Sequence, residues 1–176
     1  MPTNLIQIDW DGPFTLAEVR KLDNGNTDYG IYQIYGPSPT YCRVELLYIG
    51  LAGRGDGQTF AIRIPQHAAS KIDGFRDASQ ALIYVGRLAG TETPDNSVWS
   101  KQIELAERLL IYAHYPTYNK MKDLGGLEPQ LRDVHVLNWK KHRDLFPEVS
   151  GARLCFRDFA NHKVYGTHEQ RTPRAG

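Results

Sequence analysis

The chain has 176 residues, of which 41% are apolar and 23% charged, and its formal net charge is +1. This length suits one domain, and the composition excludes intrinsically disordered and fibrous proteins. A net charge this close to zero also lacks the overall positive field that is typical of many nucleic-acid-binding proteins.

No segment approaches the run of about 18 apolar residues that a membrane-spanning helix needs. The first residues, MPTNLIQIDW, also lack the positive and apolar regions of a secretory signal. We therefore expect a cytoplasmic protein with no membrane partner. The two cysteines, Cys42 and Cys155, are too few for a disulfide framework or a zinc site and are predicted to be free thiols.

The first strong pattern is YGIYQIY, which predicts a strand in residues 29–35 because β-branched and aromatic residues alternate along it. The following GPSPT, residues 36–40, has the composition of a turn. Residues 42–49, CRVELLYI, then form a returning strand in this reading. The result is an antiparallel hairpin in which Tyr32 and Tyr48 are expected on one face.

A glycine-rich segment, LAGRGDGQT, follows at residues 51–59 and predicts a loop. It lacks the GK[ST] ending of a phosphate-binding P-loop. Its Arg54-Gly55-Asp56 tripeptide is the one used in cell adhesion, which has no place in a cytoplasmic protein.

The segment FAIRIPQHAASKID, residues 60–73, is predicted to be helical, with Arg63 and His67 four residues apart on one face. Pro65 lies between them, and proline is most comfortable at the first position of a helix. The helix is therefore expected to begin near Pro65, with Arg63 preceding it.

A third strand is predicted in residues 80–88, QALIYVGRL, and a long helix from residue 98 to about residue 114. Apolar residues at spacings of three and four mark the buried stripe of this helix. Glu107 falls inside the stripe, and a buried carboxylate is costly unless it is paired, hydrogen-bonded or bound to a metal. The helix is expected to end before Pro116.

These residues together resemble the GIY-YIG nuclease superfamily. The elements that carry the resemblance are Gly30-Ile31-Tyr32, Tyr48-Ile49-Gly50, Arg63 with His67, and Glu107 followed by Pro116 and Asn119. They occur in the family's order over residues 30–119, which is about half of the chain.

The resemblance implies an α+β fold with a small three-stranded antiparallel sheet flanked by helices. Residues 29–124 would form the nuclease-like core, residues 1–28 an N-terminal extension, and residues 125–176 a C-terminal extension packed on the core. The implied activity is metal-dependent hydrolysis of phosphodiester bonds in DNA.

The resemblance also implies a role for each site residue. Tyr32 would activate water as the general base or its relay, with His67 taking or sharing its proton. Tyr48 would orient the water or the phosphate through its hydroxyl. Arg63 would contact two phosphate oxygens and stabilise charge in the transition state.

Glu107 would bind one divalent cation, Mg²⁺ or another such as Mn²⁺, held mainly by water and the scissile phosphate. Asn119 would support the site by hydrogen bonds or touch the phosphate. Arg54 is a rival to Arg63 for the phosphate-contacting arginine, because it is closer in sequence to the YIG strand.

The C-terminal part of the chain, residues 132–176, holds nine Lys or Arg and five Asp or Glu. Its segments NWKKHR (138–143) and RLCFRDF (153–159) mix aromatic and basic residues, which suits contacts with a nucleic-acid backbone. The same segments are also compatible with elements that cover the sheet and leave their basic groups in water.

Two other functions remain compatible with the sequence. The first is a catalytically silent GIY-YIG module that binds nucleic acid, and the second is a structural or interaction protein. A restriction-type enzyme acting on a palindromic site would be a homodimer, since protein symmetry matches site symmetry. The resemblance is compatible with a restriction, a repair or a mobile-element role.

Overall fold

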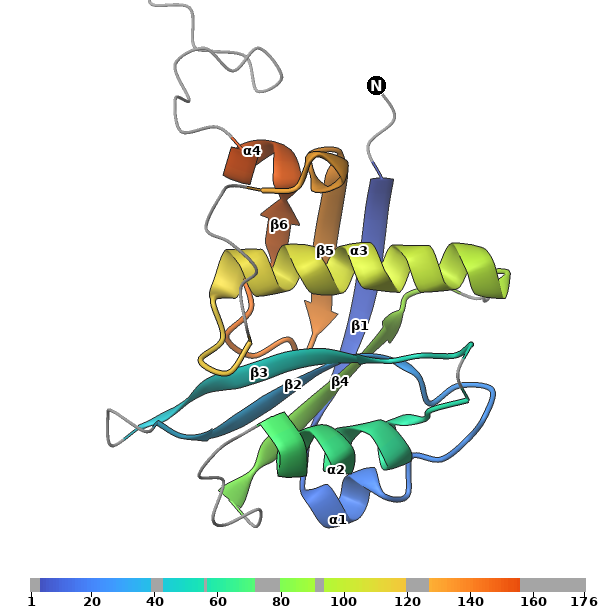
Figure 1. The fold of residues 1–176 in the computed structure, drawn as a ribbon, viewed down its shortest axis with the longest axis vertical. Helices are drawn as coiled ribbons and strands as arrows, with labels where there is room; N and C mark the ends of the chain where they lie inside the picture. The colour runs from blue at the N-terminus through green and yellow to red at the C-terminus, as the bar shows by residue number, and fades with distance from the viewer. Residues whose placement is uncertain are drawn as a thin grey trace, which may run out of the picture.

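A computed structural model describes residues 4–38, 43–55, 57–71, 80–90, 94–119 and 127–155. In chain order, its elements are β1 (Asn4–Phe14), α1 (Leu16–Val19), β2 (Gly30–Pro37), β3 (Val44–Ala52), α2 (Phe60–Lys71), β4 (Leu82–Leu88), α3 (Asn96–His114), the 3₁₀ turn η2 (Pro129–Leu131), β5 (Val134–Lys140), β6 (Glu148–Ser150) and α4 (Gly151–Cys155) (Figure 1).

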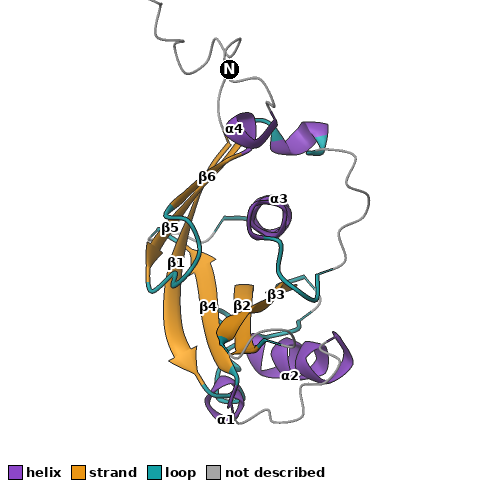
Figure 2. Ribbon diagram, turned by 90° about the vertical axis from the view of Figure 1, so that its left-hand side faces the viewer, coloured by secondary structure: helices purple, strands orange, loops and turns teal. Residues whose placement is uncertain are grey.

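The sheet has six strands in the order β3-β2-β4-β1-β5-β6, so the predicted three-stranded antiparallel sheet is wrong. Strand β1 pairs with β4 in the antiparallel sense and with β5 in the parallel sense, which makes the sheet mixed. It is curled into a half-barrel, and α3 lies along its inner side (Figure 2). The physical reason is that β4 has a second edge whose backbone N–H and C=O groups need partners, and β1 supplies them.

Strands from both ends of the chain therefore complete the sheet. Along β1, the residues Ile6, Ile8 and Trp10 are buried and alternate with more exposed ones. Val134 and Val136 do the same along β5. This alternation is the signature of strands with one covered face, and it lies outside the segment that carries the family motifs.

Two hydrophobic cores lie on opposite faces of the sheet. Core residues between α3 and the sheet include Ile8, Trp10, Ile31, Leu109 and Val136. Core residues on the face covered by α1 and α2 include Val19, Tyr32, Ile34, Phe60 and Ile83. Neighbouring residues Ile31 and Tyr32 belong to different cores because successive side chains of a strand point to opposite faces.

The local elements agree with most of the sequence-based predictions. The hairpin is confirmed as β2 and β3, the third strand as β4, and the long helix as α3. Helix α3 ends at His114, where Tyr115 adopts a left-handed φ of 49° directly before Pro116. Proline cannot continue a helix, and it also disfavours helical backbone at the residue before it.

The prediction that the second helix begins near Pro65 is wrong. Helix α2 begins at Phe60, and Pro65 lies inside it. The Thr59 carbonyl accepts hydrogen bonds from the N–H groups of Ile62 and Arg63, so the first turn is closed before the proline is reached. Arg63 and His67 are therefore one helical turn apart on the same element.

None of the helices in the described ranges is long and apolar enough to cross a membrane. Some sequence-based predictions fall outside these ranges: Cys42, the side chain of Cys155, Asp56 of the adhesion-like tripeptide, and residues 156–159 of the second basic segment.

Candidate active site

The β2–β3 hairpin sets the two motif tyrosines side by side. Its register pairs Tyr32 with Gly50 and Ile34 with Tyr48. Both tyrosine side chains therefore point to the face that α2 covers, and their ring centroids are 6.2 Å apart. The prediction that Tyr32 and Tyr48 share a face is confirmed. Tyr32 is fully buried and Tyr48 is half-buried.

The glycines of both motif tripeptides have a steric reason. A Cβ on Gly50 would lie 2.6 Å from the hydroxyl oxygen of Tyr32 and 2.6 Å from Cε1 of Tyr48. A Cβ on Gly30, which has a φ of +146°, would lie 2.0 Å from the carbonyl oxygen of Gly86 on β4. Gly50 thus makes room for the two tyrosines, and Gly30 lets β2 approach β4 closely.

Helix α2 brings His67 against this pair of rings. The Tyr32 hydroxyl and His67 Nδ1 form a short hydrogen bond, and His67 is buried. The imidazole also contacts the Tyr48 ring edge to face, with centroids 5.4 Å apart. Depending on the imidazole tautomer, the phenol either donates its proton to Nδ1 or accepts the Nδ1 proton.

Arg63 lies one turn before His67 on α2 and is partly exposed. Within the part of the chain that the structure describes, its guanidinium forms no hydrogen bond or ion pair. Its positive charge nevertheless partly opposes the increase that burial causes in the pKa values of Tyr32, Tyr48 and Glu107. Arg63 is therefore a cation directed at this cluster with its hydrogen-bonding capacity unused by described residues.

Glu107 reaches the same cluster from α3. Burial, with the Glu104 carboxylate as a smaller cause, raises its pKa to about 7, although Arg63, Arg108 and a hydrogen bond from the Leu51 backbone act to lower it. No ion pair to Glu107 occurs among the described residues. Glu107 is intermediate in exposure, and a partly buried carboxylate that forms no ion pair is stabilised by a bound cation.

The two tyrosines are neutral phenols in this setting. Burial raises the pKa of Tyr32 well above its usual value of 10, and the nearby Tyr48 and Glu107 add to the increase. Burial and the Glu107 charge also raise the pKa of Tyr48. Neither phenol is ionised near neutral pH, so Tyr32 can move a proton only if it passes its own proton on.

Asn119 is tied to the edge of the sheet. Its side-chain oxygen accepts the Ile49 N–H at 2.9 Å, and its amide nitrogen donates to the Ile49 carbonyl at 2.8 Å. The neighbouring Tyr118 N–H donates to the Leu47 carbonyl. The Asn119 side-chain amide thus satisfies backbone groups at the edge of β3. This is compatible with the supporting role that the sequence indicates. Both polar atoms of the amide are then engaged with the backbone.

The structure separates the two rival arginines. Arg54 donates to the Pro94 carbonyl at 3.2 Å, two residues before α3 begins, whereas Glu107 lies more than ten residues further along α3. At 1.5 Å per residue, this places Arg54 on the order of 15 Å from the Glu107 end of the cluster. Arg63, unlike Arg54, influences the ionisation of Tyr32, Tyr48 and Glu107.

In the basic segment 138–143, the charged side chains contact other residues of the same chain. Asn138 is buried and accepts the Trp10 indole N–H at 2.9 Å. Lys140 and Lys141 form ion pairs with Asp9 and Asp11. Arg143 stacks over the ring of Tyr35, 4.2 Å from its centroid. This arrangement favours the reading of the segment as part of the sheet and its cover.

One contributor to the site geometry was missed in the sequence. Gly86 is the backbone that Gly30 approaches, and a Cβ on Gly86 would itself lie 2.6 Å from Ile8 and 2.9 Å from Trp10. An isolated glycine within a predicted strand signals such a close approach. The signal was present in QALIYVGRL, but its partners β1 and β2 are distant in sequence.

Comparison with known proteins gave no match among family models, curated proteins or solved structures. The features of this chain that indicate a function are therefore the cluster of Tyr32, Tyr48, Arg63, His67 and Glu107 and the sequence motifs that these residues form.

Proposed function

We propose that this protein is a metal-dependent DNA endonuclease that hydrolyses phosphodiester bonds. The observation that supports this most is the convergence of three groups from three elements. A hydrogen-bonded Tyr32–His67 pair, the Arg63 guanidinium without a described partner, and the Glu107 carboxylate without a described cation meet at one place. Metal-assisted phosphodiester hydrolysis uses a proton acceptor, a positive charge and a metal ligand.

Water activation falls to Tyr32 and His67. As water loses a proton to the Tyr32 oxygen, the phenol passes its own proton to Nδ1 of His67, so Tyr32 stays neutral throughout. The raised pKa of Tyr32 makes a stable phenolate unfavourable and supports this relay over a direct phenolate base. The water oxygen then bonds to phosphorus while the bond to the leaving sugar oxygen breaks.

Arg63 and Tyr48 act on the phosphate. The planar guanidinium can donate to two phosphoryl oxygens at once, where negative charge builds up in the transition state. Tyr48 is half-buried next to Tyr32, and its hydroxyl forms no hydrogen bond to another described residue, so it can orient the attacking water or a phosphate oxygen.

Glu107 is the residue that would hold a divalent cation, Mg²⁺ or Mn²⁺. No group of three or more His, Cys, Asp or Glu side chains that could hold a metal comes together within the described ranges. This donor set fits Mg²⁺, which keeps several waters and is often bound by one or two carboxylates and substrate phosphates. When bound, such an ion supplies positive charge at the phosphate and the leaving oxygen.

The choice of DNA as substrate depends on the GIY-YIG resemblance. The basic segment 138–143 adds little support, because its Lys140 and Lys141 are paired with Asp9 and Asp11. The alternative is a silent module that binds nucleic acid without cutting it. Glu107 counts against this alternative, since a binding module has no need for a partly buried carboxylate at the tyrosine pair.

The proposal is tested by incubating the purified protein with supercoiled plasmid in Mg²⁺, Mn²⁺ or EDTA. Glu107→Ala is compared with Glu104→Ala, which removes an exposed carboxylate less than one turn away on α3. Arg63→Ala is compared with Arg54→Ala in the same way. We expect nicked or linear product that requires the metal, Glu107 and Arg63, with both control variants active.

Each other outcome is informative. Cleavage that survives Glu107→Ala would remove Glu107 from the site, and dependence on Arg54 rather than Arg63 would exchange the arginine roles. If no condition yields cleavage but a gel-shift assay shows binding, the silent module replaces the nuclease. Sedimentation of the protein with and without a palindromic duplex tests the homodimer expected of a restriction-type enzyme.

A further inference from the structure

The loop of residues 22–28, which we call the α2 strap, connects α1 to β2 and lies across the start of α2. Its backbone carbonyls receive the first N–H groups of that helix: Phe60 donates to Asp28 at 2.9 Å and Ala61 donates to Leu22 at 3.1 Å. The first N–H groups of a helix have no partner within it. Here the strap provides those partners.

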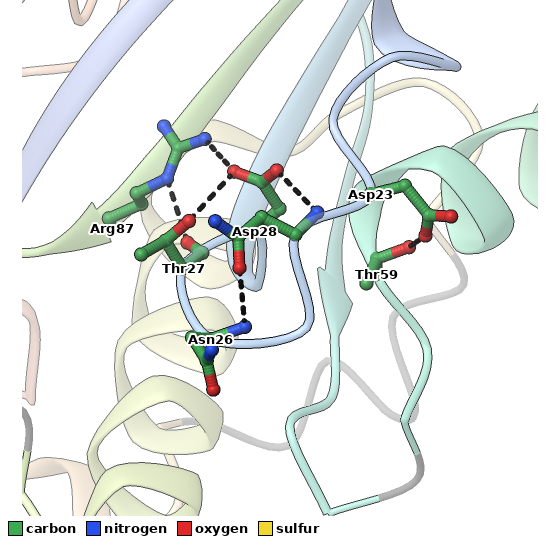
Figure 3. Close-up of polar contacts among 7 residues, drawn as sticks. Asp23, Asn26, Thr27, Asp28, Thr59 and Arg87 are labelled. Carbon is green, nitrogen blue, oxygen red and sulfur yellow. Dashed lines mark hydrogen bonds and ion pairs between the residues drawn. The ribbon is translucent and has the colours of Figure 1, made fainter.

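The α2 strap is held in shape by Asp28. The Asp28 carboxylate accepts the Asn24 N–H at 2.9 Å and forms an ion pair with Arg87 of β4, with Nη2 at 2.7 Å from Oδ1 (Figure 3). Arg87 also donates from Nε to the Thr27 carbonyl at 2.9 Å. The guanidinium thus grips both a side chain and a main-chain group of the strap, a geometry that lysine cannot reproduce.

A second attachment lies at the other end of the strap. The Thr59 hydroxyl, directly before α2, donates to the Asp23 carboxylate at 2.5 Å (Figure 3). Thr59 and Asp28 are both buried. Arg87 further lies over the ring of Phe60, 5.2 Å from its centroid. Charge-assisted hydrogen bonds of this kind, partly shielded from water, are stronger and more directional than fully exposed ion pairs.

We propose that the α2 strap is a positioning element that sets the register of Arg63 and His67 against Tyr32. Asp28 is four residues before Tyr32 in the chain, and its carbonyl holds Phe60, which is seven residues before His67. Strand β2 and helix α2 are therefore joined twice, by the strap at Asp28 and Phe60 and by the hydrogen bond between Tyr32 and His67. This inference rests on the proposed function.

Apolar packing of α2 cannot set that register alone. Phe60, Ile64 and Ala68 are buried against the sheet, but such contacts are non-directional and tolerate sliding along the helix axis. The hydrogen bond between Tyr32 and His67 tolerates little displacement, because its strength falls steeply with distance and angle. The directional bonds of the strap supply the constraint that packing lacks.

The test compares Asp28→Asn and Arg87→Lys with Lys141→Ala, which breaks the Lys141–Asp11 ion pair outside the strap. NMR follows the ring nitrogens of His67 and the amide exchange of Phe60 and Ala61 in the full chain. We expect shifted His67 signals and faster exchange in both strap variants and native behaviour in the control. Native-like His67 signals in folded strap variants would overturn the proposal.

Cleavage kinetics add a readout that a merely stabilising role would not move. Asp28→Asn should lower the single-turnover rate at saturating DNA by up to about 10²-fold, as a small misplacement of catalytic groups does. In a Tyr32→Phe background the same change should cost about tenfold less, because the contact it supports is already lost. Equal losses in both backgrounds would refute positioning through this contact.

Two further arms keep the result decisive. If Asp28→Asn does not fold, Thr59→Val, which removes only the Asp23 hydrogen bond, replaces it. If the native protein cleaves no DNA, the proposed function fails, and the strap is judged on the His67 signals and amide exchange alone.

Discussion

At the scale of single residues, the positions of Tyr32 and Tyr48 depend on neighbouring residues that have no reactive side chain. Gly50 is the clearest case, since the space a side chain would take is filled by the Tyr32 hydroxyl and the Tyr48 ring. The YIG motif is therefore a packing requirement as much as a chemical one. The two tyrosine side chains can pack beside His67 because β3 has no Cβ at position 50.

This requirement predicts the effect of Gly50→Ala. The added methyl must displace at least one tyrosine, so we expect a loss of about 1 to 3 kcal/mol in the free energy of unfolding, typical of an overpacked core. Cleavage should fall by roughly 10²-fold from the misplaced hydroxyl. Chemical denaturation and plasmid cleavage measure the two effects.

Gly55→Ala is the matched control, because its Cβ would meet only the Asn96 side-chain nitrogen, at 3.3 Å. It should stay close to native in both assays. A Gly50→Ala protein with native stability and native cleavage would show that the tyrosines are placed by other contacts.

Glu107 predicts a specific pH dependence of stability. Its pKa is about 7 in the folded protein against a usual 4.5, so between these values the folded state binds more protons than the unfolded state. Stability then falls as pH rises through this window, and the loss is complete above pH 7. Glu107→Gln should remove this slope and raise the free energy of unfolding at pH 8 by up to about 3 kcal/mol.

Urea denaturation of both proteins at pH 5 and pH 8 measures this difference. His114 acts in the opposite direction, because burial lowers its pKa to about 4 and its stabilisation is lost as pH falls from 6.5. Comparing the variant with the native protein at each pH cancels the His114 contribution. An unchanged difference between the two proteins at pH 5 and pH 8 would refute the raised pKa.

At the scale of elements, α2 combines two conflicting features. Its apolar residues pack on β2, β3 and β4, yet Pro65 interrupts its hydrogen-bond ladder between the two candidate site residues Arg63 and His67. Proline at this depth lacks the N–H that would reach the Ala61 carbonyl. The helix persists because the α2 strap, the Thr59 carbonyl and the buried face hold its first turns.

Replacing Pro65 by Ala tests this account. The restored N–H can bond to the Ala61 carbonyl, and we expect a gain of about 1 to 2 kcal/mol in the free energy of unfolding, reduced by the greater freedom of the unfolded chain. Thermal and chemical denaturation measure it. Ile62→Ala, an exposed position on the same helix, is the control, and a loss of stability in Pro65→Ala would show that the proline is accommodated without cost.

At the scale of the whole molecule, β1 joins the motif-bearing strands to the C-terminal ones. It pairs with β4 on one side and β5 on the other, and Trp10 donates to Asn138 across the sheet. Residues 4–10 thereby contact residues 134–140. A site assembled on β2, β3, α2 and α3 depends on a core that both chain ends complete.

We therefore expect a chain limited to residues 29–124 not to fold on its own. Removing β1, β5 and β6 exposes one edge of β4 and the apolar face of α3, including Leu109 and Leu110. Circular dichroism and ¹H–¹⁵N NMR spectra of the fragment, beside the full chain, measure this. Dispersed amide signals and a cooperative unfolding transition in the fragment would show an independent nuclease-like core.

The hairpin, the third strand and the long helix could be predicted from the sequence, because each depends on local periodicity and turn chemistry. The candidate site residues were also accessible, since their spacing forms a motif. The sequence alone therefore determined which side chains to consider and which elements carry them.

Only the tertiary structure decided the rest. The six-stranded order, the central place of β1, the contact of Arg54 with Pro94 and the partners of Asn119 all depend on pairings between distant segments. Such pairings are set by which strand edges and helix faces remain unsatisfied after local elements form. Local periodicity does not indicate which of these edges pair with one another, so the six-stranded sheet is determined only by the tertiary structure.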